Sequence, residues 1–268
     1  LDFYWTVNVL AREVTKWTIA CDKRLLRLVS YMHATRHLSQ TSWIGNQAKD
    51  ITLALFCAAS FAGDLRDSKS TTGCFLALIG TRTFAPISWL CKKQTAVSHS
   101  STEAEIIALD AALRLEGLPV LLLWELVIDI LSGKNSTAKI HQYYEQDDLR
   151  LQHQDDPFNV DYISKTLPYS QSEAKLLILE DNDAVITMCQ KSRSPMLRHC
   201  ARTHRVDLHW MLERIREDSG IVMRYINTKL QAADILTKGT FDQNQWQNLL
   251  ELCNIVSATK EPEPKYLQ

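Results

Sequence analysis

Apolar residues recur along this chain with two different periods, which separate candidate strands from candidate helices. Three runs are apolar or alternate between apolar and polar residues, as strands do: I-T-L-A-L-F-C-A-A (51–59), T-T-G-C-F-L-A-L-I-G (71–80) and F-A-P-I-S-W-L-C (84–91). The polar turn G-D-L-R-D-S-K-S (63–70) separates the first two runs. The pattern predicts an antiparallel meander of three strands.

Helical periodicity lies on both sides of this meander. Residues 7–35 carry apolar residues at helical spacing and predict two helices. Ser100 is expected to open a further helix, with Glu103 completing a capping box three residues later. Gly117 and Pro119 should kink this helix before it continues to Leu131.

A polar stretch over residues 132–172 then interrupts the pattern, and we expect an inserted, flexible loop there. Beyond it the sequence predicts two strands (175–181 and 221–227), a helix from Asn182 to about Lys191, a longer helix (202–217), and closing helices around Ala233 and over 241–255. This order predicts an α/β domain over residues 49–256. A helical connector (1–48) would precede it, and a disordered tail (257–268) would follow.

Composition narrows the class of protein only a little. A chain of 268 residues that is 46% hydrophobic can bury a sizeable core, and its net charge of −1 neither supports nor excludes a nucleic-acid partner. The seven widely spaced cysteines, with no C-x-x-C, predict buried reduced thiols. The run 118–131 is too short to span a bilayer and no signal peptide is recognisable, so we expect a cytoplasmic or nuclear protein without a membrane partner, cut from a longer chain.

Three acids stand at the edges of apolar elements far apart in the sequence: Glu105 in S-T-E-A-E-I-I, Asp181 in L-I-L-E-D-N and Asp234 in A-A-D-I-L. Carboxylates presented in this way are typical of a divalent-metal site. A fourth segment, L-F-C-A-A-S-F-A-G-D, has the strand-to-turn pattern that should supply another acid, and it carries Ala58 there.

Each of the three acids also has a structural explanation. Glu105 could complement the dipole of its helix, Asp181 could be the N-cap of the helix that begins at Asn182, and Asp234 could be a surface acid on a short helix. Asp64 is expected to be a turn residue, with compensation for the missing acid as the alternative.

Four residues of one stretch, His199, Cys200, His204 and His209, are of the types that bind zinc. Only Cys200 and His204 share a helical face at the i, i+4 spacing, so we expect a packing role for His204. A structural role is also expected for His99, which precedes the Ser100 cap.

The segments around the acids resemble those of a known family. They are S-F-A-G-D-x-x-D-S-K-S-T-T-G, I-S-W-x-x-K-K-Q-x-x-V-S-H-S-S-T-E-A-E, E-D-N-D-A, R-T-H-R-V-D and A-D-I-L-T-K. In this order they resemble the C-terminal ribonuclease H region of copia-type retrotransposon polyproteins, and the match runs from about Leu53 to Lys238. The helices before it look like the end of the preceding reverse-transcriptase and connection region.

The resemblance implies a ribonuclease H-like fold with a mixed five-stranded sheet flanked by helices. It implies an enzyme that hydrolyses the RNA strand of RNA–DNA hybrids during reverse transcription, with Glu105, Asp181 and Asp234 as catalytic metal ligands for two Mg²⁺ (or Mn²⁺) ions. The family pattern has an aspartate at position 58, where it bridges both metals, and a methyl group at Ala58 cannot do so. We therefore expect weak or no hydrolase activity.

Substrate contacts are expected around the meander, at Arg66, Lys69, Ser70, Thr71, Lys92 and Lys93. The alternative is a solvated turn and strand end. A second function remains open for the whole chain, which could be a non-catalytic remnant or a host-retained domain that binds nucleic acid or a protein partner.

Overall fold

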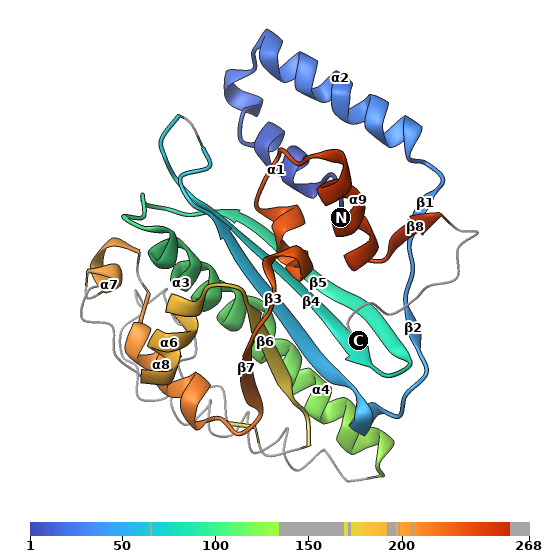
Figure 1. Cartoon of the computed structure of the whole chain (residues 1–268), viewed down its shortest axis with the longest axis vertical. Helices are drawn as coiled ribbons and strands as arrows, with labels where there is room; N and C mark the ends of the chain where they lie inside the picture. Colours follow the sequence, from blue (N-terminus) through green and yellow to red (C-terminus); the bar gives the residue numbers. More distant parts are fainter. Residues whose placement is uncertain are drawn as a thin grey trace, which may run out of the picture.

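A computed structural model describes residues 1–64, 66–133, 169–170, 173–191, 197, 199–204 and 206–257 (Figure 1). The predicted insertion (132–172) lies outside the described residues apart from its two ends, as does the predicted tail after Ser257. Ser257 itself belongs to a strand.

A six-stranded mixed sheet forms the centre of the fold. Its spatial order is β2-β5-β4-β3-β6-β7, with antiparallel pairing from β2 to β3 and parallel pairing from β3 to β7. The strands are β2 (Trp43–Ile44), β3 (Thr52–Ser60), β4 (Thr71–Gly80), β5 (Thr83–Lys93), β6 (Leu176–Glu180) and β7 (Ile221–Tyr225). The expected meander is therefore β3-β4-β5. The sixth strand, β2, contains only two residues and shows no alternation, so its pairing with β5 could not be predicted from the sequence.

Helices cover both faces of the sheet (Figure 1). One face carries α3 (Ser101–Ala112), η3 (Leu113–Gly117), α4 (Leu118–Leu131), α6 (Asp183–Lys191), α7 (Cys200–Thr203) and α8 (Leu208–Glu217). The other carries η5 (Thr228–Leu230), η6 (Ala232–Leu236) and α9 (Gln243–Leu252). Because side chains alternate along a strand, β3 sends Leu53, Leu55 and Cys57 into the first layer and Ala54, Phe56 and Ala58 into the second.

This sheet order, with helices on both faces, is the ribonuclease H-like fold, which confirms the predicted fold class. Two elements differ from expectation. The long helix predicted over 202–217 is divided into α7 and α8, because the Asp207 side chain accepts the Trp210 N–H and starts a new helix. The expected kink before Pro119 is a π-helical turn, η3.

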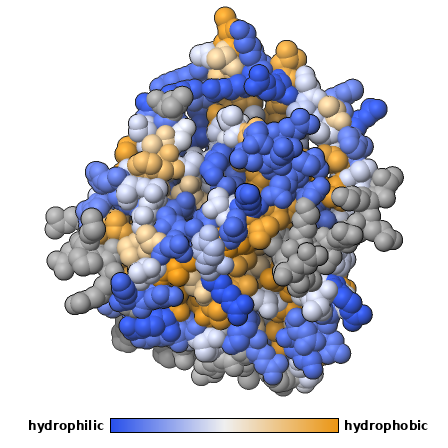
Figure 2. Space-filling model, viewed as in Figure 1, coloured by the Kyte–Doolittle hydropathy of each residue, from blue (hydrophilic) through white to orange (hydrophobic). Residues whose placement is uncertain are grey.

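The N-terminal segment contains the two predicted helices, α1 (Tyr4–Ala11) and α2 (Ile19–Ala34), with short 3₁₀ turns η1 (Val14–Lys16) and η2 (Ala48–Asp50). It also supplies β1 (Leu38–Gln40), which pairs antiparallel with β8 (Ile255–Ser257). The segment is therefore joined to the domain through β1 and β2 as well as through helices. Figure 2 shows mainly hydrophilic residues along the α2 edge, with isolated apolar side chains projecting among them.

The cysteine prediction is confirmed. All seven cysteines lie among the described residues, and all are buried and free of disulfides. Burial raises the pKa of the Cys91 thiol to about 11, so it stays protonated and unreactive at neutral pH. Over the described part of the chain, helices are too short or too polar to cross a bilayer.

Candidate active site

The candidate site lies where β3 and β6 end side by side. Their parallel register pairs Phe56 with Leu179, and two residues further along each chain come Ala58 and Asp181. On its other side Ala58 pairs with Gly73 of β4. The two positions that the sequence placed in separate segments are therefore neighbours at one end of the sheet.

The 3₁₀ helix η6, which carries Asp234, is fastened across these strand ends. The buried side chain of Gln231 donates hydrogen bonds to the carbonyl oxygens of Cys57 (2.9 Å) and Leu179 (3.3 Å), one from each strand. Gly73 allows the close approach, because a Cβ there would lie 2.8 Å from the carbonyl oxygen of Ala233. The position of Asp234 is thus set by buried polar contacts and by a residue without a side chain.

Glu105 reaches the same place from α3. Small residues at the contact (Ala59, Ala104 and Ala108) let α3 pack closely on β3, and the Glu105 carboxylate accepts a hydrogen bond from the backbone N–H of Ala59. Burial, together with the charges of Asp181 and Asp234, raises the pKa of Glu105 to about 8, while the Ala59 hydrogen bond and the charge of Lys238 act in the opposite direction. Glu105 lies beyond the first turn of α3, so its surroundings are those of a site residue more than of a dipole partner.

The alternative for Asp181 as a helix cap is wrong. The side chain of Asn182 occupies that role, since its Oδ1 accepts the backbone N–H groups of Ala184 (3.0 Å) and Val185 (3.3 Å). Asp181 is left at the end of the strand without a capping contact, and its charge raises the pKa values of Glu105 and Asp234.

Asp234 is also more enclosed than the surface alternative predicted. Its side chain is 14% exposed and binds the ammonium group of Lys238 at 2.7 Å. Burial raises the pKa of Asp234, and the Lys238 charge works in the opposite direction. Lys238 therefore neutralises part of the negative charge at the site.

Glu105 contacts Ala59 of β3, Asp181 follows β6, and Asp234 belongs to η6, so all three acids lie around the strand end that carries Ala58. Among the described residues their carboxylate oxygens do not all come within 4.8 Å of one another. The Glu105 Oε2 atom is buried and has no hydrogen-bond partner among the described residues. An oxygen donor of this kind, beside two further carboxylates, fits a hard divalent cation. Ala58 contributes no ligand, so the residues fit an incomplete metal site.

Sequence reasoning missed a fourth acid, Glu180. It is the last residue of β6 and is fully buried, and only one of its carboxylate oxygens has a hydrogen-bond partner among the described residues, the backbone N–H of Asn182 (3.2 Å). Burial raises the pKa of Glu180 to about 9, with further contributions from Glu105 and Asp181. The sequence did carry a signal for its burial. Side chains alternate along β6, so Glu180 and Asp181 point to opposite faces of the sheet, and Glu180 points into the layer of α3.

A groove of about 1120 Å³ lies beside the candidate site and reaches the N-terminal helices, and its lining includes Lys238 but none of Ala58, Glu105, Asp181 and Asp234. Ser60, Thr237 and Lys238 line its inner end, and α1 and α2 form its opposite wall. Seven basic residues line it: Arg12, Lys16, Arg24, Arg27, Arg66, Lys93 and Lys238. The groove is therefore a cationic surface inside a protein of nearly zero net charge.

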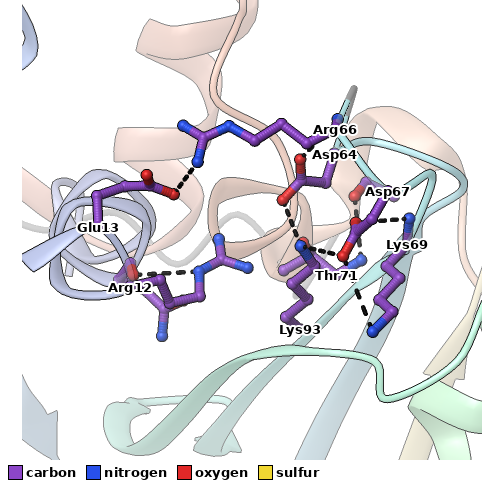
Figure 3. A network of polar contacts seen from close by, with 10 residues as sticks. Arg12, Glu13, Asp64, Arg66, Asp67, Lys69, Thr71 and Lys93 are labelled. Atoms are coloured by element: carbon purple, nitrogen blue, oxygen red, sulfur yellow. Dashed lines mark hydrogen bonds and ion pairs between the residues drawn. The ribbon is translucent and has the colours of Figure 1, made fainter. Parts of the chain in front are cut away.

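The predicted substrate contacts divide into two groups. Four side chains lie at the groove or its rim, and Figure 3 shows three of them held by acids: Arg66 binds Glu13, Lys69 binds Asp67, and Lys93 binds both Asp64 (2.5 Å) and Asp67 (2.9 Å). Thr71 is the fourth.

Asp64 thus has a turn and ion-pair role, and the bond from Lys93 lowers its pKa. Ser70 is buried and its hydroxyl accepts the backbone N–H of Ala62, so it faces the turn. Lys92 is exposed and lies outside the groove lining.

No family model matches the chain. The uncharacterized mitochondrial protein AtMg00810 of Arabidopsis thaliana is 32% identical over 108 residues, which is 40% of this chain and 42% of that protein. The chain therefore spans less than half the length of that relative. Among solved structures, LC11-RNase H1, isolated from compost by a metagenomic approach, is 12% identical and covers 69% of this chain and 92% of its own, with a TM-score of 0.33.

The burial of Glu180 predicts a pH-dependent stability. An ordinary glutamate pKa is 4.5, and the folded value is about 9, so the folded state holds a proton that the unfolded chain has lost between these pH values. The free energy of unfolding should therefore fall as pH rises through this window, by up to about 1.4 kcal/mol per pH unit for one group. Glu180→Gln should flatten this fall, as measured by urea unfolding at pH 5.5 and 8.5.

Glu217→Gln, at an exposed position of α8, is the matched control and should keep the wild-type slope. An equal pH dependence in the wild type and in Glu180→Gln would contradict the assignment of a buried, proton-holding Glu180.

Proposed function

We propose that this chain, similar in its sequence and its fold to the C-terminal ribonuclease H region of copia-type retrotransposon polyproteins, is a ribonuclease H-type domain with an impaired active site. The observation that carries the proposal is the placement of the elements: Glu105 contacts Ala59 of β3, Asp181 follows β6, and Gln231 ties η6, which carries Asp234, to both strands. The substrate would be the RNA strand of an RNA–DNA hybrid, and the reverse-transcriptase region of the same polyprotein would be the partner on the α1–α2 side.

In this proposal Glu105, Asp181 and Asp234 would hold Mg²⁺ or Mn²⁺. Bound divalent cations would neutralise phosphate charge and assist the attack of water. The chain itself holds two of the carboxylates in place: Glu105 through the Ala59 N–H, and Asp234 through η6, which the Gln231 hydrogen bonds tie to both strands. Such preorganisation is what positions charge for phosphodiester hydrolysis.

Ala58 limits what this arrangement can do. Its backbone pairs with Gly73 of β4, while its methyl group packs with apolar residues of η6 and offers no oxygen. Without a carboxylate at position 58, the Lys238 ammonium balances part of the negative charge of the remaining acids. The raised pKa of Glu105 means that protonation removes a further part of it. We therefore infer hybrid binding with slow cleavage or none.

The groove supports the substrate assignment. It includes Lys238, the ion-pair partner of Asp234, and is lined by more basic than acidic side chains, which suits a phosphate backbone. Aromatic residues on its walls, among them Trp5, Tyr31 and Trp246, could pack on sugars or bases. The sequence left open a second function, that of a non-catalytic binding domain. Such a domain would use the same groove, and restoring a carboxylate at position 58 would not make it cleave the hybrid.

Restoring the missing carboxylate should restore catalysis. We expect Ala58→Asp to raise Mg²⁺-dependent cleavage of an RNA–DNA hybrid by at least about 100-fold, since removal of one strong electrostatic contact at an active site costs about that much. The measurement is the initial rate of cleavage of a labelled hybrid under single-turnover conditions.

Ala58→Asn is the matched control, because it has nearly the same shape without the charge, and it should leave the rate at the wild-type level. Ala58→Asp combined with Glu105→Gln should lose the restored activity. Cleavage by the wild type at the rate of Ala58→Asp would contradict the impairment. No cleavage by Ala58→Asp, with hybrid binding intact, would favour the non-catalytic domain.

Hybrid binding should depend on the basic groove. Lys16→Ala combined with Arg27→Ala should raise the dissociation constant of a hybrid several-fold, and should lower the slope of log K against log salt by about 0.9 for each phosphate contact removed. Lys49→Ala with Lys191→Ala, two exposed lysines outside the groove, is the control for total charge. Fluorescence anisotropy at several salt concentrations measures both quantities, and equal losses in the two double variants would contradict a groove-bound hybrid.

A further inference from the structure

A second cluster of titratable side chains lies at the beginning of α3, on residues that the candidate active site does not use. Its centre is Glu103, whose side chain is 1% exposed. Ser100 caps the helix by accepting the Glu103 N–H, as predicted, but the reciprocal half of the capping box is wrong. The Glu103 carboxylate instead accepts the backbone N–H of His99 at 2.9 Å.

Two histidines approach the other oxygen of this carboxylate. The Nε2 atoms of His199 and His204 both lie 3.0 Å from Glu103 Oε1. His204 is enclosed, with its Nδ1 atom buried and unpaired among the described residues, whereas the His199 side chain is 39% exposed. The expected packing role of His204 is therefore a contact to a buried carboxylate.

His99 completes a ligand-like set. Its exposed ring stands edge-on to the ring of His199, with the ring centroids 5.3 Å apart. One side-chain atom from each of His99, Glu103 and His199 lies within 4.8 Å of the others, and among the described residues this is the group of three potential metal ligands that meets this spacing. The set is not the one considered from sequence, because His99 and Glu103 come from a segment nearly a hundred residues before His199.

The separation of His199 and Glu103 is close to that of two ligands in the coordination shell of zinc. Ligand atoms about 2.1 Å from a tetrahedral ion stand about 3.4 Å from each other. The observed 3.0 Å between His199 Nε2 and Glu103 Oε1 needs only a small opening to admit an ion. Two exposed or half-exposed histidines on one side leave an entry path from solvent, and a buried carboxylate on the other supplies a fixed anchor.

We propose that His99, Glu103 and His199 form a binding site for a divalent transition-metal ion of the zinc type, with water in the fourth position. His204 would act as a positioning residue, holding Glu103 through its Nε2 atom. Mixed imidazole and carboxylate donors select zinc-like ions, in contrast to the all-carboxylate set at the ends of β3 and β6, which suits Mg²⁺ or Mn²⁺. A metal ion bound there would cross-link the start of α7 to the start of α3, two elements that lie beside one another in Figure 1.

The experiment is a titration of the purified full chain with Co²⁺, a spectroscopic substitute for zinc, followed by competition with Zn²⁺. We expect one equivalent of Co²⁺ to give the visible absorption of a tetrahedral ion and Zn²⁺ to displace it. His99→Ala and His199→Ala should each weaken binding at least about tenfold, since even an indirect ligand contact is worth about 10 to 100-fold in affinity.

His99 is exposed, so His99→Ala keeps the fold and remains a fair test. His209→Ala, at an exposed position of α8, is the control and should bind as the wild type does. Glu105→Gln changes the candidate active site and should bind Co²⁺ as the wild type does. This result would show that the histidine site is independent of the candidate active site and of the proposed function.

Three outcomes would overturn the proposal: no tetrahedral Co²⁺ spectrum, unchanged affinity in both His99→Ala and His199→Ala, or loss of binding in Glu105→Gln. A strong thiolate charge-transfer band would do the same, because it would place the ion on a cysteine such as Cys200.

Discussion

The parallel pairing of β3 with β6 is the constraint on which the rest of the candidate site depends. It joins two strands that are more than a hundred residues apart in sequence, and it places their carboxyl ends at one edge of the sheet. Because both strands are buried on both faces, their register is held by the apolar layers above and below them. Gln231 then uses one carbonyl of each strand to fix η6, so the location of Asp234 follows from the same pairing.

This geometry crowds several acidic side chains together, and the crowding has electrostatic consequences. Glu105, Glu180, Asp181 and Asp234 share a partly dry region, and burial with mutual repulsion raises the pKa of Glu105 to about 8. Protonation and the Lys238 ammonium relieve this charge in the absence of other cations. Ala58 adds no further negative charge to this cluster, and under the proposed function it would also supply no ligand to a metal ion there. Stability and catalysis make opposite demands at such a site.

The features that could be predicted from the sequence are those that a local pattern specifies. Long apolar strands, the helix capped by Ser100 and the three separated acids could all be predicted, because alternation, capping and flanking segments are local signals. The two-residue strand β2 could not, since it exists only through its pairing with Phe84 and Thr83. Glu180 and the cluster around Glu103 were missed for a related reason. Their roles arise from burial and from partners nearly a hundred residues away, which no local pattern reports.

The central claim is that the strand-end acids form a divalent-cation site from which the ligand at position 58 is missing. Anomalous X-ray scattering from Mn²⁺ in crystals of the Ala58→Asp variant tests it most directly. The account predicts manganese bound by carboxylate oxygens of Glu105 and Asp181 together with the carboxylate introduced at position 58. A variant that leaves these carboxylates without an ion at saturating Mn²⁺ would contradict it.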